Sequence, residues 1–379
     1  MAKKHSNGVL VIPALNPEEK FLDLAVEMAQ YFEDIIVVND GSDEEHRGVF
    51  DAIKTALGDK VHLLVHEVNQ GKGVALKTAF SYYLESSLKE DYVGLVAADS
   101  DGQHEYADVV MLDEKLGEQH ERCIHIGHRD LNSKIMPFRS KFGNKLTAFL
   151  FNVLYGVKLK DTQTGLRAFS ADILPWLIEL KGSRFEYEMN MLIHSKNAEV
   201  ALIEHPIKTK YEENHKSTYS TFKDSFRVGK VLLGPLLWFI VAALAACIVD
   251  IGGFALLEYW FLPDVVHINE IAVSILIATV VSRAVSSVIN FCCNRFVTFG
   301  GKRISRSSIW KYYLLFFVQM GASYGLVLGF TALFGGGQVF IKIVVDLILS
   351  LCSYQVQMRW VFKKKKEKKK KKAGGETVA

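Results

Sequence analysis

The sequence predicts an α/β domain on a mostly parallel, Rossmann-like sheet, followed by an all-α membrane domain of four helices. Short apolar runs alternate with helical patterns over residues 1–225, which is typical of strands connected by crossover helices. Long apolar segments dominate residues 226–362, and each approaches the length that crosses a bilayer. Residues 363–379 form a Lys-rich tail that we expect to be disordered and cytoplasmic.

The expected elements of the first domain follow from the hydrophobic pattern. Apolar runs of four to seven residues, bounded by turn residues, predict strands at 8–12, 35–38, 61–65, 92–98 and 123–126. Helical periodicity predicts helices at 18–32, 49–57 and 73–88. A segment at 134–155 mixes basic residues with a later apolar run, so we expect a helix lying at a membrane surface, with an ordinary packed helix as the alternative.

Charge is distributed unevenly along the chain. The formal net charge is +3, but the tail alone holds nine Lys and two Glu, which leaves a net charge of −4 for the rest. A basic run beside an apolar segment indicates the cytoplasmic side of a membrane. No basic face with interleaved aromatic residues accompanies it, so we expect no nucleic-acid partner. The five Cys include no C-x-x-C pair, and we interpret them as reduced core residues.

Polar clusters follow each of the predicted strands. They lie at 13–16, 39–42, 69–73, 99–101 and 127–129. Any one of them is a plausible turn. Because the carboxyl ends of parallel strands meet at one edge of a sheet, the clusters together predict a binding crevice. A carboxylate, a Gly-rich segment and a Lys are the groups that a mononucleotide requires.

The pair Asp99 and Asp101 directly follows a predicted buried strand. Two acids one residue apart at this position form a suitable site for a hard divalent cation that bridges a diphosphate. A solvated acidic turn is the alternative interpretation of an isolated D-x-D.

The ordered motifs resemble family-two glycosyltransferases of the GT-A fold. They are P-A-L-N (13–16), V-V-N-D-G-S (37–42), N-Q-G-K-G-V-A-L (69–76), D-S-D-G-Q-H (99–104) and G-H-R (127–129). Three later motifs, P-F-R (137–139), D-T-Q-T-G-L-R (161–167) and F-E-Y-E (185–188), are similar to the polyprenyl-phosphate branch typified by dolichol-phosphate mannose synthase. The resemblance covers residues 8–225. One departure is Pro17, where the family usually has Glu after the Asn of the first motif.

The resemblance implies roles for individual residues. Mg²⁺ or Mn²⁺ would be bound by Asp99, Asp101 and Gln103. We expect the nucleotide-sugar to be bound by Pro13, Ala14, Asn16, Asp40, Asn69, Lys72, Asp99 and Ser100. The acceptor phosphate would contact Arg129, Arg139, Lys216 and Ser217, since Arg suits fixed-geometry phosphate recognition. The catalytic set would be Asp99, Asp101, Arg129 and Arg139, with His104 as a neighbour.

These roles imply transfer of a sugar from a UDP- or GDP-sugar to undecaprenyl or dolichyl phosphate, for cell-envelope glycans or protein glycosylation. A lipid phosphate is already an anion and needs no general base, and in-line attack would invert the anomeric centre. Two alternatives remain open. A glycolipid synthase with a diacylglycerol-type acceptor would require a base, near Asp161. A lipid-linked sugar translocator would use the spans to move product.

Four membrane spans are predicted at about 236–260, 271–293, 312–334 and 339–361. The basic connections all fall on one side, and no signal peptide is recognised. We therefore expect an integral membrane protein whose catalytic domain and two termini are cytoplasmic. Glycines 321, 325 and 329 form a tandem G-x-x-x-G that favours close helix packing, and so a homo-oligomer through these spans.

The second and fourth spans end in similar segments, at 290–299 and 353–362. This weak repeat resembles the GtrA-like family of four-span proteins, which are built as two hairpins. Asp250 and Arg283 are charges inside predicted spans at similar depths. We predict that the two residues form an ion pair.

Overall fold

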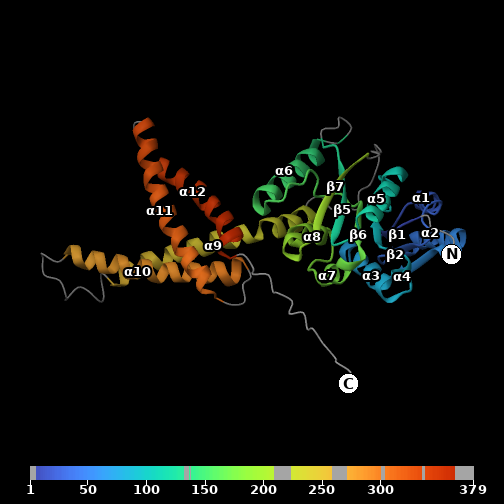
Figure 1. Ribbon diagram of the computed structural model, residues 1–379, viewed down its shortest axis with the longest axis horizontal. Coiled ribbons are helices and arrows are strands. Elements are labelled where there is room, and N and C mark those ends of the chain that lie inside the picture. The colour runs from blue at the N-terminus through green and yellow to red at the C-terminus, as the bar shows by residue number, and fades with distance from the viewer. Residues whose placement is uncertain are drawn as a thin grey trace, which may run out of the picture. The chain divides into compact units, whose positions relative to one another are not determined.

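The computed structural model describes residues 6–131, 136, 138–208, 223–257, 271–299, 304–334 and 338–362 (Figure 1). The chain divides into two compact units, Met1–Leu232 and Leu233–Ala379. The Lys-rich tail, 363–379, lies outside the described residues.

The first unit is built on a seven-stranded sheet with the order β3-β2-β1-β4-β6-β5-β7. The strands are β1 (Gly8–Ala14), β2 (Ile35–Asn39), β3 (Val61–Val65), β4 (Gly94–Ala97), β5 (Cys123–Arg129), β6 (Arg167–Ser170) and β7 (Ala201–Ile207). Only β6 is antiparallel to its neighbours, β4 and β5, and the other pairs are parallel. The prediction of a mostly parallel sheet is confirmed.

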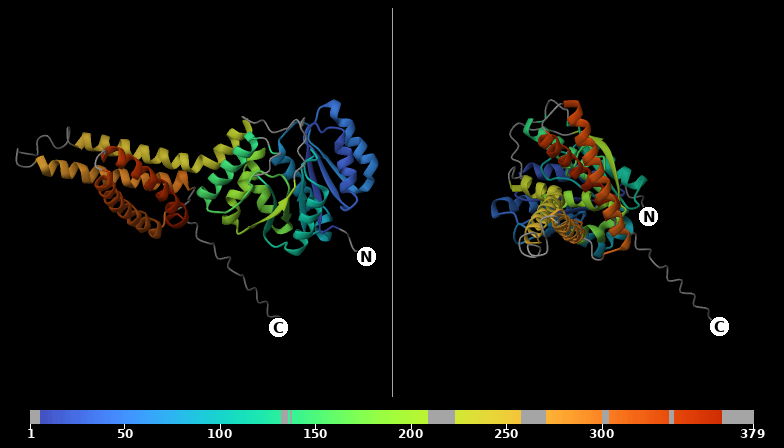
Figure 2. Two further views of the ribbon diagram at one scale, coloured as in Figure 1. Left: turned by 90° about the horizontal axis from the view of Figure 1, so that it is seen from above. Right: turned by 90° about the vertical axis from the view of Figure 1, so that its left-hand side faces the viewer.

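Helices cover both faces of this sheet (Figure 2). The helices of the first unit are α1 (Lys20–Met28), α2 (Glu44–Leu57), α3 (Lys72–Glu85), α4 (Leu88–Asp91), α5 (Tyr106–Glu118), α6 (Phe138–Tyr155), α7 (Leu174–Glu179) and α8 (Phe185–Ala198). One core joins alternate residues of β1 and β2, such as Leu10 and Val37, to residues of α1, α2 and α5. Because successive strand residues point to opposite faces, Val11 and Val38 face the other layer, where α3 packs on β1 and β2.

The predicted elements are all present, with shifted ends. The strand predicted at 92–98 is shorter, as β4, and the strand predicted at 123–126 continues to Arg129, so the G-H-R cluster is the end of β5 itself. Helices α4, α5, α7 and α8 and strands β6 and β7 were not predicted from the sequence. The four residues of β6 begin with Arg167, and a short strand that starts with a charge has no distinctive hydrophobic pattern.

Nearly all described residues of the second unit are helical (Figure 2). Its helices are α9 (Lys223–Leu256), which begins in the first unit, α10 (Ile271–Cys293), α11 (Arg306–Phe334) and α12 (Gln338–Val356). They match the four predicted spans in position, and α9 begins thirteen residues before the predicted start. Among the described residues, Lys223–Leu256 and Arg306–Leu333 meet the length and composition needed to cross a membrane.

The repeat predicted for the ends of the second and fourth spans is visible in the structure. Helices α10 and α12 each continue into one π-helical turn, Asn294–Thr298 and Gln357–Val361. The side chain of Asn294 donates to Gln357 Oε1 at 3.3 Å, and the rings of Phe299 and Phe362 stack with centroids 5.2 Å apart. Equivalent residues of the two hairpins therefore pair with each other.

The predicted ion pair inside the spans is confirmed. Arg283 Nη2 lies 3.1 Å from Asp250 Oδ2, which links α10 to α9. Ser286 Oγ donates to the other carboxylate oxygen of Asp250 at 3.2 Å. Both oxygens of Asp250 are thus engaged within the second unit.

Candidate active site

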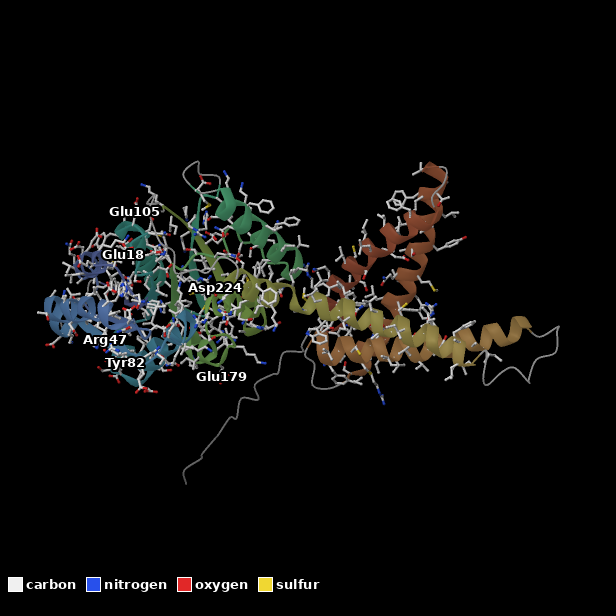
Figure 3. All side chains as sticks on the ribbon, turned by 180° about the vertical axis from the view of Figure 1, so that it is seen from behind. Glu18, Arg47, Tyr82, Glu105, Glu179 and Asp224 are labelled. Carbon is white, nitrogen blue, oxygen red and sulfur yellow. The ribbon has the colours of Figure 1, made fainter. Side chains whose placement is uncertain are left out.

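The predicted site residues lie where the strands of the first unit end. Asn16 follows β1, Asp40 follows β2, and Asp99 follows β4, at the carboxyl edge of neighbouring parallel strands. Figure 3 labels Glu18 and Glu105 in the segments that follow β1 and β4. The sheet order therefore brings together Asn16 and Asp99, which are 83 positions apart in the sequence.

Asp99 forms an ion pair with Lys72, the first residue of α3. Lys72 Nζ lies 2.6 Å from Asp99 Oδ1 and 3.1 Å from Glu188 Oε1 of α8. Burial alone would lower the pKa of Lys72, but Asp99 and Glu188 outweigh it and raise the pKa above its usual value. Lys72 is therefore a fixed positive charge between two acids.

The other oxygen of Asp99 faces His104 and the backbone of Gly165. His104 Nε2 lies 3.4 Å from Asp99 Oδ2, and a Cβ added at Gly165 would collide with that oxygen. Burial alone would raise the pKa of Asp99, but Lys72 and then His104 outweigh it and hold the pKa well below its usual range. The carboxylate is therefore ionised and fixed in position.

The chemistry of Asp99, Asp101 and Gln103 suits a divalent cation, since all three offer the hard oxygen ligands that Mg²⁺ and Mn²⁺ take. Asp101 Oδ1 accepts from Gln103 N at 3.0 Å, which orders this turn. Both ring nitrogens of His104 are buried, and apart from the 3.4 Å approach of Nε2 to Asp99 neither has a polar partner among the described residues. No three His, Cys, Asp or Glu side chains within the described ranges converge into a metal site. A cation would therefore complete its coordination with oxygens of the donor and water.

Asp40 holds the Gly-rich segment that opens α3. Its carboxylate accepts from Gln70 N at 2.9 Å, from Gly71 N at 2.7 Å and from the ring of His66 at 2.8 Å. Gly71 has φ +98°, and a Cβ there would collide with Ser183, so only glycine lets this segment pack so closely. Asp40 thus fixes the loop that carries Lys72.

Asn16 joins the first two strand ends. Its φ is +47°, its backbone N–H donates to Ser42 Oγ at 2.9 Å, and its side chain exchanges hydrogen bonds with Asp43. Pro13 and Ala14 are the last residues of β1 and are buried. In two other motifs, Asn69 Oδ1 is buried without a partner among the described residues, and Ser100 is half-buried.

Arg129, at the end of β5, is engaged with Asp161. Its Nε lies 2.6 Å from Asp161 Oδ2 and its Nη2 lies 3.1 Å from Oδ1, which is a bidentate pair. Burial alone would raise the pKa of Asp161, but Arg129 outweighs it and lowers the pKa. The side chain of Arg139 lies outside the described part of the chain, as do Lys216 and Ser217.

Sequence reasoning missed three residues that contact the candidate site: Glu188, Gly165 and His66. Glu188 and Gly165 lie inside quoted motifs, but their spacing gives no sign that one meets Lys72 and the other meets Asp99. His66 is buried, bonded to Asp40 and 3.0 Å from Thr78 Oγ1. The one sequence signal for His66 was its position directly after β3.

Two family models match the chain. The model described as glycosyl transferase family 2 matches residues 9–174. The model described as the transmembrane domain of GtrA/DPMS matches residues 238–362. The first match ends in α7 and contains the strand ends described above, and the second covers the helical second unit from within α9.

The chain is also similar in sequence to two curated proteins. The chain is 31% identical over 220 residues to UDP-N-acetylglucosamine–dolichyl-phosphate N-acetylglucosaminyltransferase of Methanococcus voltae, which is 54% of this chain and 86% of that protein. It is 25% identical over 255 residues to the human dolichyl-phosphate beta-glucosyltransferase, covering 62% of this chain and 76% of that protein.

Proposed function

The chain belongs to family 2 of the glycosyltransferases and carries a GtrA/DPMS transmembrane domain, and from that premise we propose that it transfers a sugar from a nucleotide-sugar to a polyprenyl phosphate. The protein is a glycosyltransferase and a membrane protein, and its first unit has the GT-A fold that the sequence predicted. In the proposed reaction the acceptor is a lipid phosphate, the anomeric centre is inverted and a divalent metal is required.

The observation that carries the proposal is the fixed, ionised Asp99 beside Lys72 at the carboxyl edge of the sheet. Asp99 would bind the cation together with Asp101 and Gln103, and Lys72 adds a positive charge near the diphosphate. A bound Mg²⁺ or Mn²⁺ would neutralise the diphosphate and stabilise it as it leaves. Asp40, Asn69 and Ser100 would contact the nucleotide-sugar, with Pro13, Ala14 and Asn16. The Methanococcus relative, by its name, uses a UDP-sugar, which favours UDP over GDP.

The outer face of α6 supports a lipid acceptor. Four apolar side chains on this helix are 42–62% exposed, namely Phe142, Leu146, Phe149 and Val153. They recur at intervals of three or four residues, so they share one face, and Lys141 and Lys145 lie beside them. Such a face suits a membrane surface, where the phosphate of a lipid acceptor would be presented.

A phosphate acceptor also agrees with the state of Asp161. A diacylglycerol-type acceptor would require a general base, which the sequence analysis expected near Asp161. Asp161 is fully buried, paired with Arg129 and of lowered pKa, so it is a poor base. We assign Arg129 to the acceptor phosphate, together with Arg139, Lys216 and Ser217.

The orientation proposed for the protein places the first unit and both termini in the cytoplasm. Its support is the charge pattern, since basic residues lie in the first turns of α9, between α10 and α11, and after α12. In the described chain, added Cβ atoms at Gly321, Gly325 and Gly329 would meet open space. This agrees with a homo-oligomer formed through α11, which stays a prediction.

One assay tests the proposed function. Purified full-length protein is incubated with Mn²⁺, a panel of UDP- and GDP-sugars, and undecaprenyl or dolichyl phosphate, and the lipid is analysed by mass spectrometry. We expect a sugar–phosphate–lipid product, and we expect its formation to stop with chelator or in Asp101→Ala, without unfolding. In a parallel reaction, diacylglycerol replaces the lipid phosphate. Product from diacylglycerol and none from polyprenyl phosphate would contradict the proposal.

A further inference from the structure

Lys72 is shared by two carboxylates that belong to different elements. Its ammonium lies 2.6 Å from Asp99 after β4 and 3.1 Å from Glu188 on α8, and its side chain is 14% exposed. The ring of Phe185 lies 5.8 Å from the ammonium. The ammonium of Lys72 therefore pairs with two carboxylates, and one of them, Asp99, is also a proposed metal ligand.

The surroundings of Asp99 leave little room for a second cation. Its Oδ2 faces His104 and the backbone of Gly165, while its Oδ1 accepts the hydrogen bond from Lys72. A divalent cation bound at Asp99 beside Lys72 would meet a like charge at short range, and such repulsion is strong in a partly buried site. The metal and Lys72 are therefore competitors for this carboxylate.

Glu188 offers Lys72 a second place to pair. Its side chain is 10% exposed, and its backbone carbonyl accepts from Nη1 of the buried Arg167 at 3.0 Å, which holds the first turn of α8. Moving from both acids to Glu188 alone would require only a small shift of Nζ. A buried ammonium that keeps one carboxylate avoids the large penalty of an unpaired charge.

We propose that Lys72 is a resident cation that occupies Asp99 in the empty enzyme, and that it pairs with Glu188 alone once the metal–nucleotide enters. This inference rests on the proposed metal-dependent transfer. The empty enzyme should bind a divalent metal weakly when no nucleotide is present, because the ion alone must displace Lys72 from Asp99. The donor diphosphate adds negative charge that compensates both cations. Lys72 and Glu188 are thus positioning residues that favour the metal–nucleotide complex over the metal alone.

A nearby lysine provides the matched control. Lys77 lies five residues later on α3, and its Nζ donates to the backbone carbonyls of Leu180 at 2.5 Å and Gly182 at 3.1 Å. Lys77→Met and Lys72→Met remove the same charge from the same helix. Only Lys72→Met also removes a direct contact with Asp99.

The experiment measures Mn²⁺ binding to the full chain by the paramagnetic resonance of free Mn²⁺, without nucleotide and with UDP or GDP. We expect Lys72→Met to tighten binding of Mn²⁺ alone by roughly tenfold or more, because a competing charge is lost, and Lys77→Met to change it by less than about twofold. Lys72→Gln, which keeps a donor toward Glu188, is the second variant should Lys72→Met fail to fold.

A double-mutant cycle tests the part of Glu188. In the parent, Glu188→Gln should weaken Mn²⁺ binding, because Lys72 is left with Asp99 alone. In the Lys72→Met background, the same change should have a clearly smaller effect. Equal effects in both backgrounds, or no tightening in Lys72→Met and Lys72→Gln, would overturn the inference while leaving the proposed function intact. Absence of Mn²⁺ binding from every protein, with and without nucleotide, would overturn both.

Discussion

The guanidinium of Arg129 and the carboxylate of Asp161 form a bidentate pair, at 2.6 Å and 3.1 Å, in which Asp161 is fully buried. The pair joins the end of β5 to the segment before β6, two strands that are antiparallel neighbours. Asp161 also accepts from Gln163 N at 2.9 Å. A residue assigned to the acceptor phosphate is therefore held in one orientation by a buried acid.

We predict that Asp161→Asn damages both stability and acceptor binding. Removing one member of a buried ion pair leaves an uncompensated charge and destabilises a protein by about 3–5 kcal/mol. Arg129 should also lose its fixed orientation in this variant. We therefore expect the KM for polyprenyl phosphate to rise more than the KM for the nucleotide-sugar. Thermal unfolding and steady-state kinetics measure the two effects.

Arg129→Lys serves as the companion variant. Lysine keeps the charge but loses the two-pronged geometry, so we expect roughly a tenfold loss of turnover, about the value of one charge-assisted hydrogen bond. Equal increases of both KM values in Asp161→Asn would show that the pair supports the fold without orienting Arg129 toward the acceptor.

Gly165→Ala should displace Asp99. The added Cβ would collide with the Asp99 carboxylate, which Lys72 holds from the other side. We expect weaker Mn²⁺ binding and a large loss of turnover with the secondary structure retained, as measured by metal titration and circular dichroism.

Gly48→Ala on α2 is the control for this substitution, because a Cβ at Gly48 meets nothing within 4 Å. It should leave activity unchanged and raise stability by up to about 1 kcal/mol, the helix-propensity difference between Gly and Ala. Normal Mn²⁺ affinity in Gly165→Ala would show that Asp99 has room to move.

A pair of histidines should make the first unit less stable in acid. His125 Nδ1 lies 2.9 Å from His205 Nε2 across β5 and β7, and His125 Nε2 lies 2.8 Å from the carbonyl of Gln119. Since that carbonyl only accepts, we assign the proton of neutral His125 to Nε2, so His205 donates to Nδ1. Burial lowers the pKa of both rings.

A histidine whose folded pKa is lowered contributes stability that is complete above its unfolded pKa of about 6.5 and is lost as the pH falls below that value. The melting temperature should therefore drop between pH 7.5 and pH 5.5. His205→Gln, which still donates a hydrogen bond but does not titrate, should show a smaller drop. Identical pH profiles of the two proteins would remove the pair as the cause.

We predict that removing the charge of Asp250 alone destabilises the second unit, and that removing the charges of both Asp250 and Arg283 does so much less. Asp250→Asn leaves Arg283 without its counter-charge inside a span, and an unpaired charge at the centre of a membrane helix costs roughly 2.5–3.5 kcal/mol. We expect Asp250→Asn to lower the thermal midpoint in nanodiscs, and Asp250→Asn combined with Arg283→Gln to recover most of it. A double variant less stable than the single one would contradict this view.

The architecture follows largely from local patterns. Alternating apolar runs and helical periodicity predict a parallel sheet because strand and helix repeats differ, and length alone identifies the four apolar helices. The D-x-D motif and the Gly-rich segment could be placed at the crevice because parallel strands share one carboxyl edge. Asp250 and Arg283 could be paired because helical rise converts position into depth.

The tertiary structure decided which side chains of distant elements contact each other. Glu188 comes from a helix far along the chain, yet it shares Lys72 with Asp99. Arg129 was expected to face the acceptor, and the structure shows that Asp161 holds it. Neither contact can be recognised from residue spacing in the sequence. The Arg129–Asp161 pair depends on the antiparallel strand β6, and the Lys72–Glu188 pair depends on the packing of α8. Sequence periodicity reports the face of an element, while the partner of a charged group depends on how distant elements pack.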